Sequence, residues 1–172
     1  MVSLTNTLLS RFGSKVVAPS LDLLMNNGMM WFDPRSGQPN SIAAGVKPLA
    51  NMCPIIASKD GLPHIALGAA GGRQIMPAVT QILSYIHAFG MSPEAAFHAP
   101  RIDASGVKLR VSERAKADVA SRLSEEFPVE IIADTLYPVN FSIPSLVMRD
   151  DGHNIGMAHT YHPWAAVRTE EK

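Results

Sequence analysis

Residues 67–72 (Leu-Gly-Ala-Ala-Gly-Gly) carry the strongest chemical signal in this sequence, because the glycines stand where an apolar run gives way to a helical pattern. Glycine lets the backbone turn tightly and lets a ligand approach main-chain N–H groups. The start of the helix that follows adds positive potential. Together these features predict a site for an anion or an oxyanion. A tight turn that only packs a strand against a helix is the alternative, and the segment taken alone favours it.

The other residues that could do chemistry form no convincing set. The glycine spacing fits no nucleotide-binding motif. His159 and His162 are three residues apart with His153 nearby, but zinc needs three or four convergent ligands, so we expect partly exposed tail histidines and no cofactor. No Gly-x-Ser-x-Gly motif marks a nucleophilic serine. Cys53 is expected to be a small buried hydrophobe. The chain thus offers an anion site without a nucleophile, which predicts an incomplete site.

Composition predicts a single globular domain spanning residues 1–172, since 47% of the residues are hydrophobic and 17% are charged. The 15 basic and 15 acidic residues cancel, so no basic field would attract nucleic acid or an anionic membrane. Residues 75–89 form the longest apolar run, but polar residues interrupt it, which indicates a soluble helix. The low charge predicts a partner covering part of the surface, and a homo-oligomer stays open. The first four residues resemble no signal peptide, although a missing upstream segment would make export impossible to judge.

The strands and helices that must position the glycine segment are predicted to occur in blocks along the chain. Asp-Gly between two apolar runs predicts a hairpin around residues 60–61, and a second hairpin follows at residues 150–154. Residues 28–49 form a long irregular segment typical of a binding loop. Helices and hairpins in blocks favour an α+β fold with antiparallel sheets. We expect strands over residues 2–8, 54–58, 63–68, 107–111, 129–133, 145–148 and 155–158, and helices over residues 75–89, 93–99 and 113–127, the last capped by Ser112.

Four segments resemble, in order and spacing, the small subunit of γ-glutamyltranspeptidases. They are residues 2–14, 23–29, 47–54 and 68–72. The resemblance implies an N-terminal-nucleophile hydrolase with an αββα sandwich of stacked antiparallel sheets, incomplete at the N-terminus. In that family the precursor cuts itself before a threonine, which becomes both nucleophile and base. That threonine would precede Met1, so the resemblance implies a partner: the upstream, large-subunit portion of the same protein.

The resemblance also assigns roles to individual residues. Gly71 and Gly72 match the pair whose N–H groups stabilise the oxyanion. Thr7 matches a threonine that hydrogen-bonds the nucleophile. Asn51 matches the second residue of a serine pair that holds the α-carboxylate of the substrate.

The segment that reads the α-amino group of glutamate departs from the family pattern, although Asn27 and Trp31 are still expected to bind substrate. Leu9 replaces an asparagine, Gly28 replaces a glutamine and Trp31 replaces an acidic residue. The chain is therefore expected to be closer to the family's amidohydrolase and acylase-like members than to strict γ-glutamyl transferases.

Two hypotheses follow. In the first, the intact protein hydrolyses a small amide, γ-glutamyl or otherwise acidic, with a threonine nucleophile that this chain lacks. In the second, the chain is a binding or assembly module that kept the fold and lost the chemistry.

Overall fold

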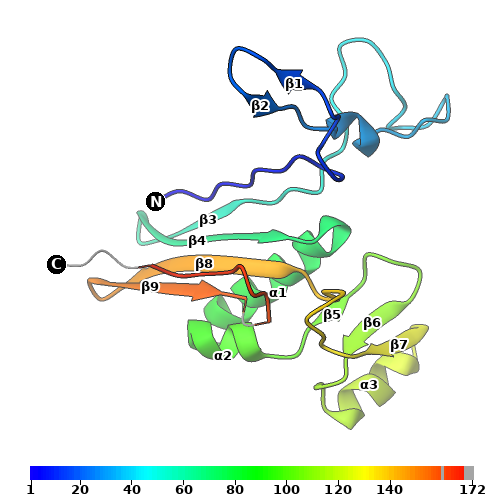
Figure 1. Cartoon of the computed structure of the whole chain (residues 1–172). Helices are drawn as coiled ribbons and strands as arrows, with labels where there is room; N and C mark the ends of the chain where they lie inside the picture. Colours follow the sequence, from blue (N-terminus) through cyan, green and yellow to red (C-terminus); the bar gives the residue numbers. More distant parts are fainter. Residues whose placement is uncertain (160, 169–172) are drawn as a thin grey trace. The chain divides into compact units, whose positions relative to one another are not determined.

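The glycine segment lies at the end of strand β4 in a four-stranded antiparallel sheet. The strand order in this sheet is β3-β4-β8-β9 (Figure 1). The strands are β3 (Ile55–Lys59), β4 (Leu62–Ala70), β8 (Ile143–Asp150) and β9 (His153–Ala158). Both predicted hairpins are present. In the first turn Asp60 and Gly61 have φ of 52° and 78°, and in the second Asp151 and Gly152 have φ of 44° and 79°. Positive φ at both central residues matches the twist of the flanking strands.

The computed structural model describes residues 1–159 and 161–168, which form two compact units. One unit combines Met1–Thr5 with the chain from Asn51 onward, and the other is Asn6–Ala50. Among these described residues, no helix has the length and apolar character needed to cross a membrane.

Helix α1 (Ile75–His87) packs on one face of the four-stranded sheet and forms the core with it. Val79 and Ile82 of the helix and Leu67 of β4 are completely buried. Burying one such side chain stabilises the fold by about 1.5–3 kcal/mol. Helix α2 (Pro93–His98) adds Phe97 to this core and begins as expected, with Ser92 Oγ accepting a hydrogen bond from the Ala95 N–H at 3.1 Å.

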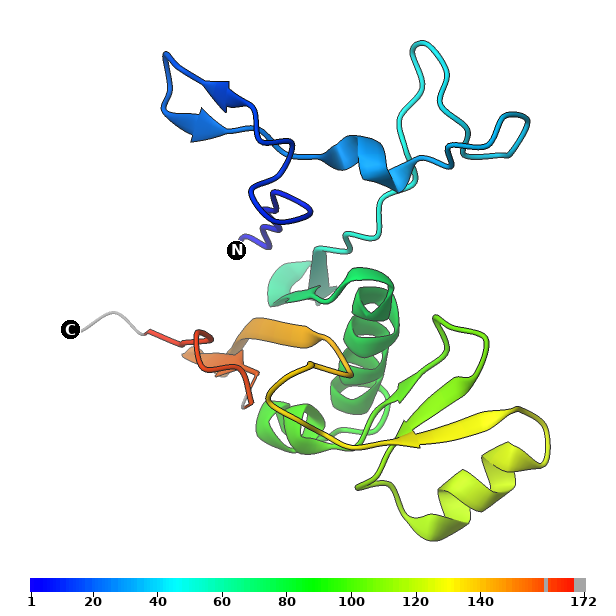
Figure 2. The same cartoon turned by 45° about the vertical axis from the view of Figure 1, so that its right-hand side comes forward.

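A second sheet contains β5 (Ile102–Asp103), β6 (Leu109–Ser112) and β7 (Val129–Ile132). Strands β6 and β7 are parallel, unlike the purely antiparallel arrangement expected, because helix α3 (Ala117–Ser124) carries the chain back between them (Figure 2).

The prediction that Ser112 caps helix α3 is wrong. Ser112 lies in β6, and its hydroxyl donates to Asp134 Oδ2 at 3.0 Å, while Lys116 precedes the helix. The helix is also shorter than expected, because residues 113–116 form a turn between the strand and the helix.

The predicted strand over residues 2–8 is absent, since the structure assigns no strand there. The side chains of residues 2–8 do alternate between exposed and half-buried. Ser3 is half-buried and donates from Oγ to the Leu67 carbonyl at 2.9 Å, whereas Val2 and Leu4 are 78% and 82% exposed. The first five residues thus contact β4 through a side chain and leave an apolar edge uncovered.

The face of the four-stranded sheet opposite α1 carries a cross-strand row of small and apolar residues. Ile56 pairs with Ala66, Ala66 with Val147, and Val147 with Gly156. Val167 covers the β9 end, because its Cγ1 lies against Gly156 and leaves no room for a Cβ there. Ile56 and Val147 remain 51% and 48% exposed. We call these four aligned residues the apolar row.

The unit Asn6–Ala50 contains a short hairpin of β1 (Val17–Ala18) and β2 (Leu23–Leu24), which the sequence analysis missed, and a 3-10 helix η1 (Gly28–Trp31). The rest of the segment over residues 28–49 is irregular, as predicted. Asn40 holds this loop together, since its Nδ2 donates to the Trp31 carbonyl at 2.6 Å and its Oδ1 accepts from the Leu49 N–H at 2.9 Å.

A cluster of ionisable groups lies where β5 begins and β9 ends. Arg101 is 4% exposed, and its Nε and Nη1 have no hydrogen-bond partner in the described part of the chain. Asp134 accepts from Arg114 Nε, and Arg114 Nη1 donates to the His98 carbonyl at 2.7 Å. His159 is 7% exposed, which corrects the expectation of a partly exposed histidine at this position, whereas His162 is partly exposed as expected. Burial, reinforced by the charge of Arg101, lowers the pKa of His159 to about 4.

We expect acid to destabilise the fold through His159. The unfolded histidine titrates near 6.5 and the folded one near 4, so only the unfolded state takes up the proton between these values. The stability of the folded state is therefore undiminished above pH 6.5 and falls by about 2–3 kcal/mol as the pH drops to 4.5. Urea unfolding at pH 7 and pH 4.5 should show a smaller loss in His159→Asn than in the wild type. His153→Asn, at the exposed start of β9, is the control, and equal losses in all three proteins would contradict the assignment.

Candidate oxyanion site

The glycine pair lies at the junction between β4 and a helical turn. Strand β4 ends at Ala70, the 3-10 helix η2 (Gly72–Gln74) follows, and α1 starts at Ile75. Gly71 has a φ of 138° and Gly72 a φ of 64°, values that L side chains rarely adopt. Among the described residues, neither glycine N–H donates a hydrogen bond to another group. Two N–H groups at the start of a helical segment are thus free to bind an anion.

The loop is held by contacts on its other side. The Gln74 N–H donates to the Gly71 carbonyl at 3.3 Å, and the Ile75 N–H donates to the Gly72 carbonyl. Ser142 Oγ donates to the Ala70 carbonyl at 2.7 Å. No sequence motif marks Ser142, because it contacts the loop from 72 residues away.

Asn51 lies beside the glycine pair. A Cβ built on Gly72 would lie 3.8 Å from Asn51 Nδ2. Asn51 is half-buried and precedes β3, so the hairpin of β3 and β4 brings it to the end of β4 where the glycines lie. A neutral amide donor next to two free N–H groups favours a ligand that carries negative charge.

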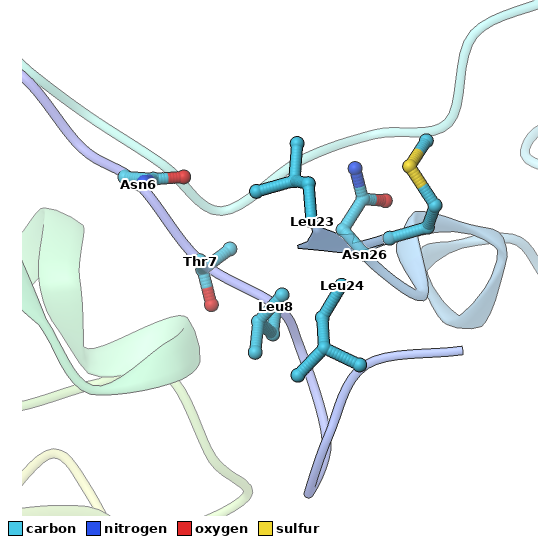
Figure 3. Close-up of a pocket in the computed structure, with 7 residues that line it drawn as sticks. Asn6, Thr7, Leu8, Leu23, Leu24 and Asn26 are labelled. Atoms are coloured by element: carbon cyan, nitrogen blue, oxygen red, sulfur yellow. The ribbon is translucent and has the colours of Figure 1, made fainter. Parts of the chain in front are cut away.

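Thr7 lies in the other unit, where it lines a pocket of about 320 Å³ (Figure 3). Its Oγ1 accepts a hydrogen bond from the Leu9 N–H at 3.1 Å. The pocket is lined by Asn6, Thr7, Leu8, Leu23, Leu24, Met25 and Asn26. All seven side chains are uncharged, so the pocket combines apolar surface with neutral hydrogen-bonding groups.

Asn27 and Trp31 belong to the same unit as Thr7, but neither lines this pocket. The Asn27 N–H donates to the Leu8 carbonyl at 2.8 Å, which ties η1 to the first segment of the unit. The Trp31 ring lies over Gly28, where a Cβ would be 3.4 Å from Trp31 Cζ3. The six predicted site residues therefore fall into two groups: Asn51, Gly71 and Gly72 in one unit, and Thr7, Asn27 and Trp31 in the other.

Metal-binding side chains do not gather in the described part of the chain, where no group of three or more His, Cys, Asp or Glu residues could hold an ion. Cys53 is half-buried and packs against the hydrophobic core, close to the expectation of a small buried hydrophobe.

Comparison with known proteins gives one consistent family. The family model described as Gamma-glutamyltranspeptidase matches residues 1–164. The chain is 32% identical over 125 residues to a glutathione hydrolase proenzyme of Bacillus subtilis, covering 72% of this chain and 21% of that protein. It is 35% identical over 123 residues to the acylase ACY 1 proenzyme of a Pseudomonas species, covering 72% of this chain and 22% of that protein.

A solved structure extends the similarity to the fold. The T380A mutant of the Helicobacter pylori gamma-glutamyltranspeptidase matches with a TM-score of 0.75 and 25% identity, over 93% of this chain and 92% of that chain. The expected fold class, the α+β fold of N-terminal-nucleophile hydrolases, is thereby confirmed. The chain spans about a fifth of the length of the curated relatives it matches. By its sequence and its fold, the chain belongs to the gamma-glutamyltranspeptidase family.

Proposed function

We propose that this chain supplies the oxyanion-stabilising half of an amide hydrolase or acyltransferase, and that the nucleophilic threonine lies in a segment of the complete protein upstream of Met1. The observation that carries the proposal is the pair of unengaged N–H groups of Gly71 and Gly72 at the start of a helical segment, beside the amide of Asn51. Membership of the gamma-glutamyltranspeptidase family supports the reaction class.

The proposed function corresponds to one series of reaction steps. The threonine hydroxyl adds to the carbonyl carbon of the amide while the α-amino group of the same threonine takes the hydroxyl proton. The carbonyl oxygen becomes an oxyanion, and the N–H groups of Gly71 and Gly72 donate to it. The C–N bond then breaks, and the leaving amine takes the proton from the α-amino group. Water releases the acyl group by hydrolysis, or a second amine accepts it by transfer.

Two features support a substrate whose acyl group carries less positive charge than the γ-glutamyl group. The positions expected to read the α-amino group hold Leu9, Gly28 and Trp31, none of which is acidic. A buried ammonium without a partner costs several kcal/mol. The pocket around Thr7 is also lined only by uncharged side chains. In this proposal Asn51 holds a carboxylate of the substrate.

The uncovered apolar surface supports a partner layer. Ile56 and Val147 of the apolar row and the outward side chains Val2 and Leu4 are each about half or more exposed. A sheet face is stable when another layer buries it. The upstream, large-subunit portion of the complete protein is the partner proposed for this surface.

The 172-residue chain by itself is expected to show no amide turnover, because the oxyanion site has no nucleophile to act with. The purified chain should be tested on γ-glutamyl-p-nitroanilide and glutaryl-p-nitroanilide by release of p-nitroaniline. Turnover above background that persists in Gly72→Pro would point to a different active site.

In the complete protein, Gly72→Pro removes one N–H donor and should lower kcat by about 10²–10³-fold. Gly90→Pro is the matched control, because Gly90 has the same φ of 64° and follows α1 without any part in the site. Circular dichroism checks that both variants fold. A folded Gly72→Pro protein with wild-type kcat would remove Gly72 from the oxyanion site.

The substrate proposal is tested by comparing kcat/KM for γ-glutamyl-p-nitroanilide with that for its glutaryl analogue, which lacks the α-amino group. We expect the complete protein to prefer the glutaryl compound, and Trp31→Asp to shift the ratio toward γ-glutamyl by restoring an acid. Trp164→Asp, at an exposed tail position, is the control. A wild-type preference of about 100-fold, or ~2.7 kcal/mol, for the γ-glutamyl compound would show that the ammonium is recognised after all.

A further inference from the structure

Ser142 occupies an unusual position for a serine. It is fully buried, and its φ of 68° lies in the left-handed region that non-glycine residues seldom adopt. Backbone of this kind persists only where the surrounding structure fixes it, and such residues gather at functional sites. Ser142 immediately precedes β8, whose first residue, Ile143, pairs with Ala70 at the end of β4. The unusual residue therefore lies directly against the glycine loop.

The contact between Ser142 and Gly71 is close on the backbone side. A Cβ on Gly71 would lie 2.9 Å from Ser142 Cα and 3.1 Å from Ser142 Oγ. No side chain other than hydrogen fits at position 71 while Ser142 keeps its place. The two residues thus fix one another, and the loop cannot move toward β8.

The hydroxyl of Ser142 controls one peptide group. It donates to the Ala70 carbonyl at 2.7 Å. The peptide between Ala70 and Gly71 is trans, so its carbonyl oxygen and the Gly71 N–H point in opposite directions from one rigid plane. Fixing the oxygen therefore fixes the direction of the N–H. A hydrogen bond to the carbonyl also polarises the peptide and makes its N–H a stronger donor.

We propose that Ser142 is a positioning residue for the oxyanion site, whose hydroxyl holds the Ala70–Gly71 peptide so that the Gly71 N–H is aimed at the oxyanion. The inference rests on the proposed function for its catalytic consequence, but the orientation of the peptide is a property of this chain alone. Loss of the hydroxyl removes the hydrogen bond that holds the Ala70 carbonyl and so loosens the orientation of the peptide.

The catalytic test uses Ser142→Ala and Ser142→Gly in the complete protein. Glycine accepts the positive φ without strain, so Ser142→Gly keeps the test valid if Ser142→Ala fails to fold. We expect kcat to fall about 10–100-fold in both variants while KM changes less than about twofold, because a misplaced donor weakens binding of the transition state and leaves substrate binding unaffected. Ser112→Ala is the matched control: Ser112 is equally buried, but its hydroxyl donates to Asp134, and kcat should stay at the wild-type value.

The structural test uses the complete protein, with the apolar row covered, and does not depend on activity. In ¹⁵N relaxation measurements the Gly71 amide should have an order parameter of about 0.85 in the wild type and below about 0.6 in Ser142→Ala, with no change in Ser112→Ala. An unchanged order parameter, or wild-type kcat in both folded Ser142 variants alongside a loss in Gly72→Pro, would overturn the proposal. If the complete wild-type protein shows no turnover, the proposed function fails, and the order parameter still decides the role of Ser142.

Discussion

The close contact between the glycine loop and the segment before β8 is the constraint on which the candidate site depends. Gly71 has no room for a side chain because Ser142 lies against it. The loop therefore joins β4 to α1 in one conformation, with its carbonyls engaged and its N–H groups free. The core behind it, where Leu67, Val79 and Ile82 are fully buried, prevents strand and helix from shifting. A close-packed core thus supplies the rigidity that a preorganised donor site needs.

Local signals predicted the elements whose causes are local. The Asp-Gly turns at residues 60–61 and 151–152, the Ser92 cap and the amphipathic α1 all depend on a few neighbouring residues, and all are present. Features that depend on distant residues were missed or wrong. Ser112 could have capped a helix, but its hydroxyl bonds to Asp134, 22 residues away. Residues 2–8 have the period of a strand, but a strand also needs a main-chain partner, which periodicity does not reveal.

The residues of the candidate site also divide into those with a local sequence signal and those whose role depends on distant contacts. Glycines at a strand-to-helix junction left an anion site and a simple tight turn as the two interpretations of the sequence, and resemblance to a family added Asn51, which lies beside Gly72. Ser142 gave no sequence signal, because its role comes from a positive φ and from a contact made through the fold of the sheet. The buried charge of Arg101, the half-buried Asp134 and the neutral His159 were hidden for the same reason, since only the fold brings them together.

The apolar row has a consequence for the chain when it is made without a covering layer. Strand β3 is an edge strand, and Ile56 on it belongs to the row, so unpaired main-chain groups and apolar side chains lie side by side. Such an edge is a template for β-aggregation between copies. A layer over the row would suppress these encounters as the sheet forms. The yield of this chain made by itself thus depends on how long the row stays uncovered.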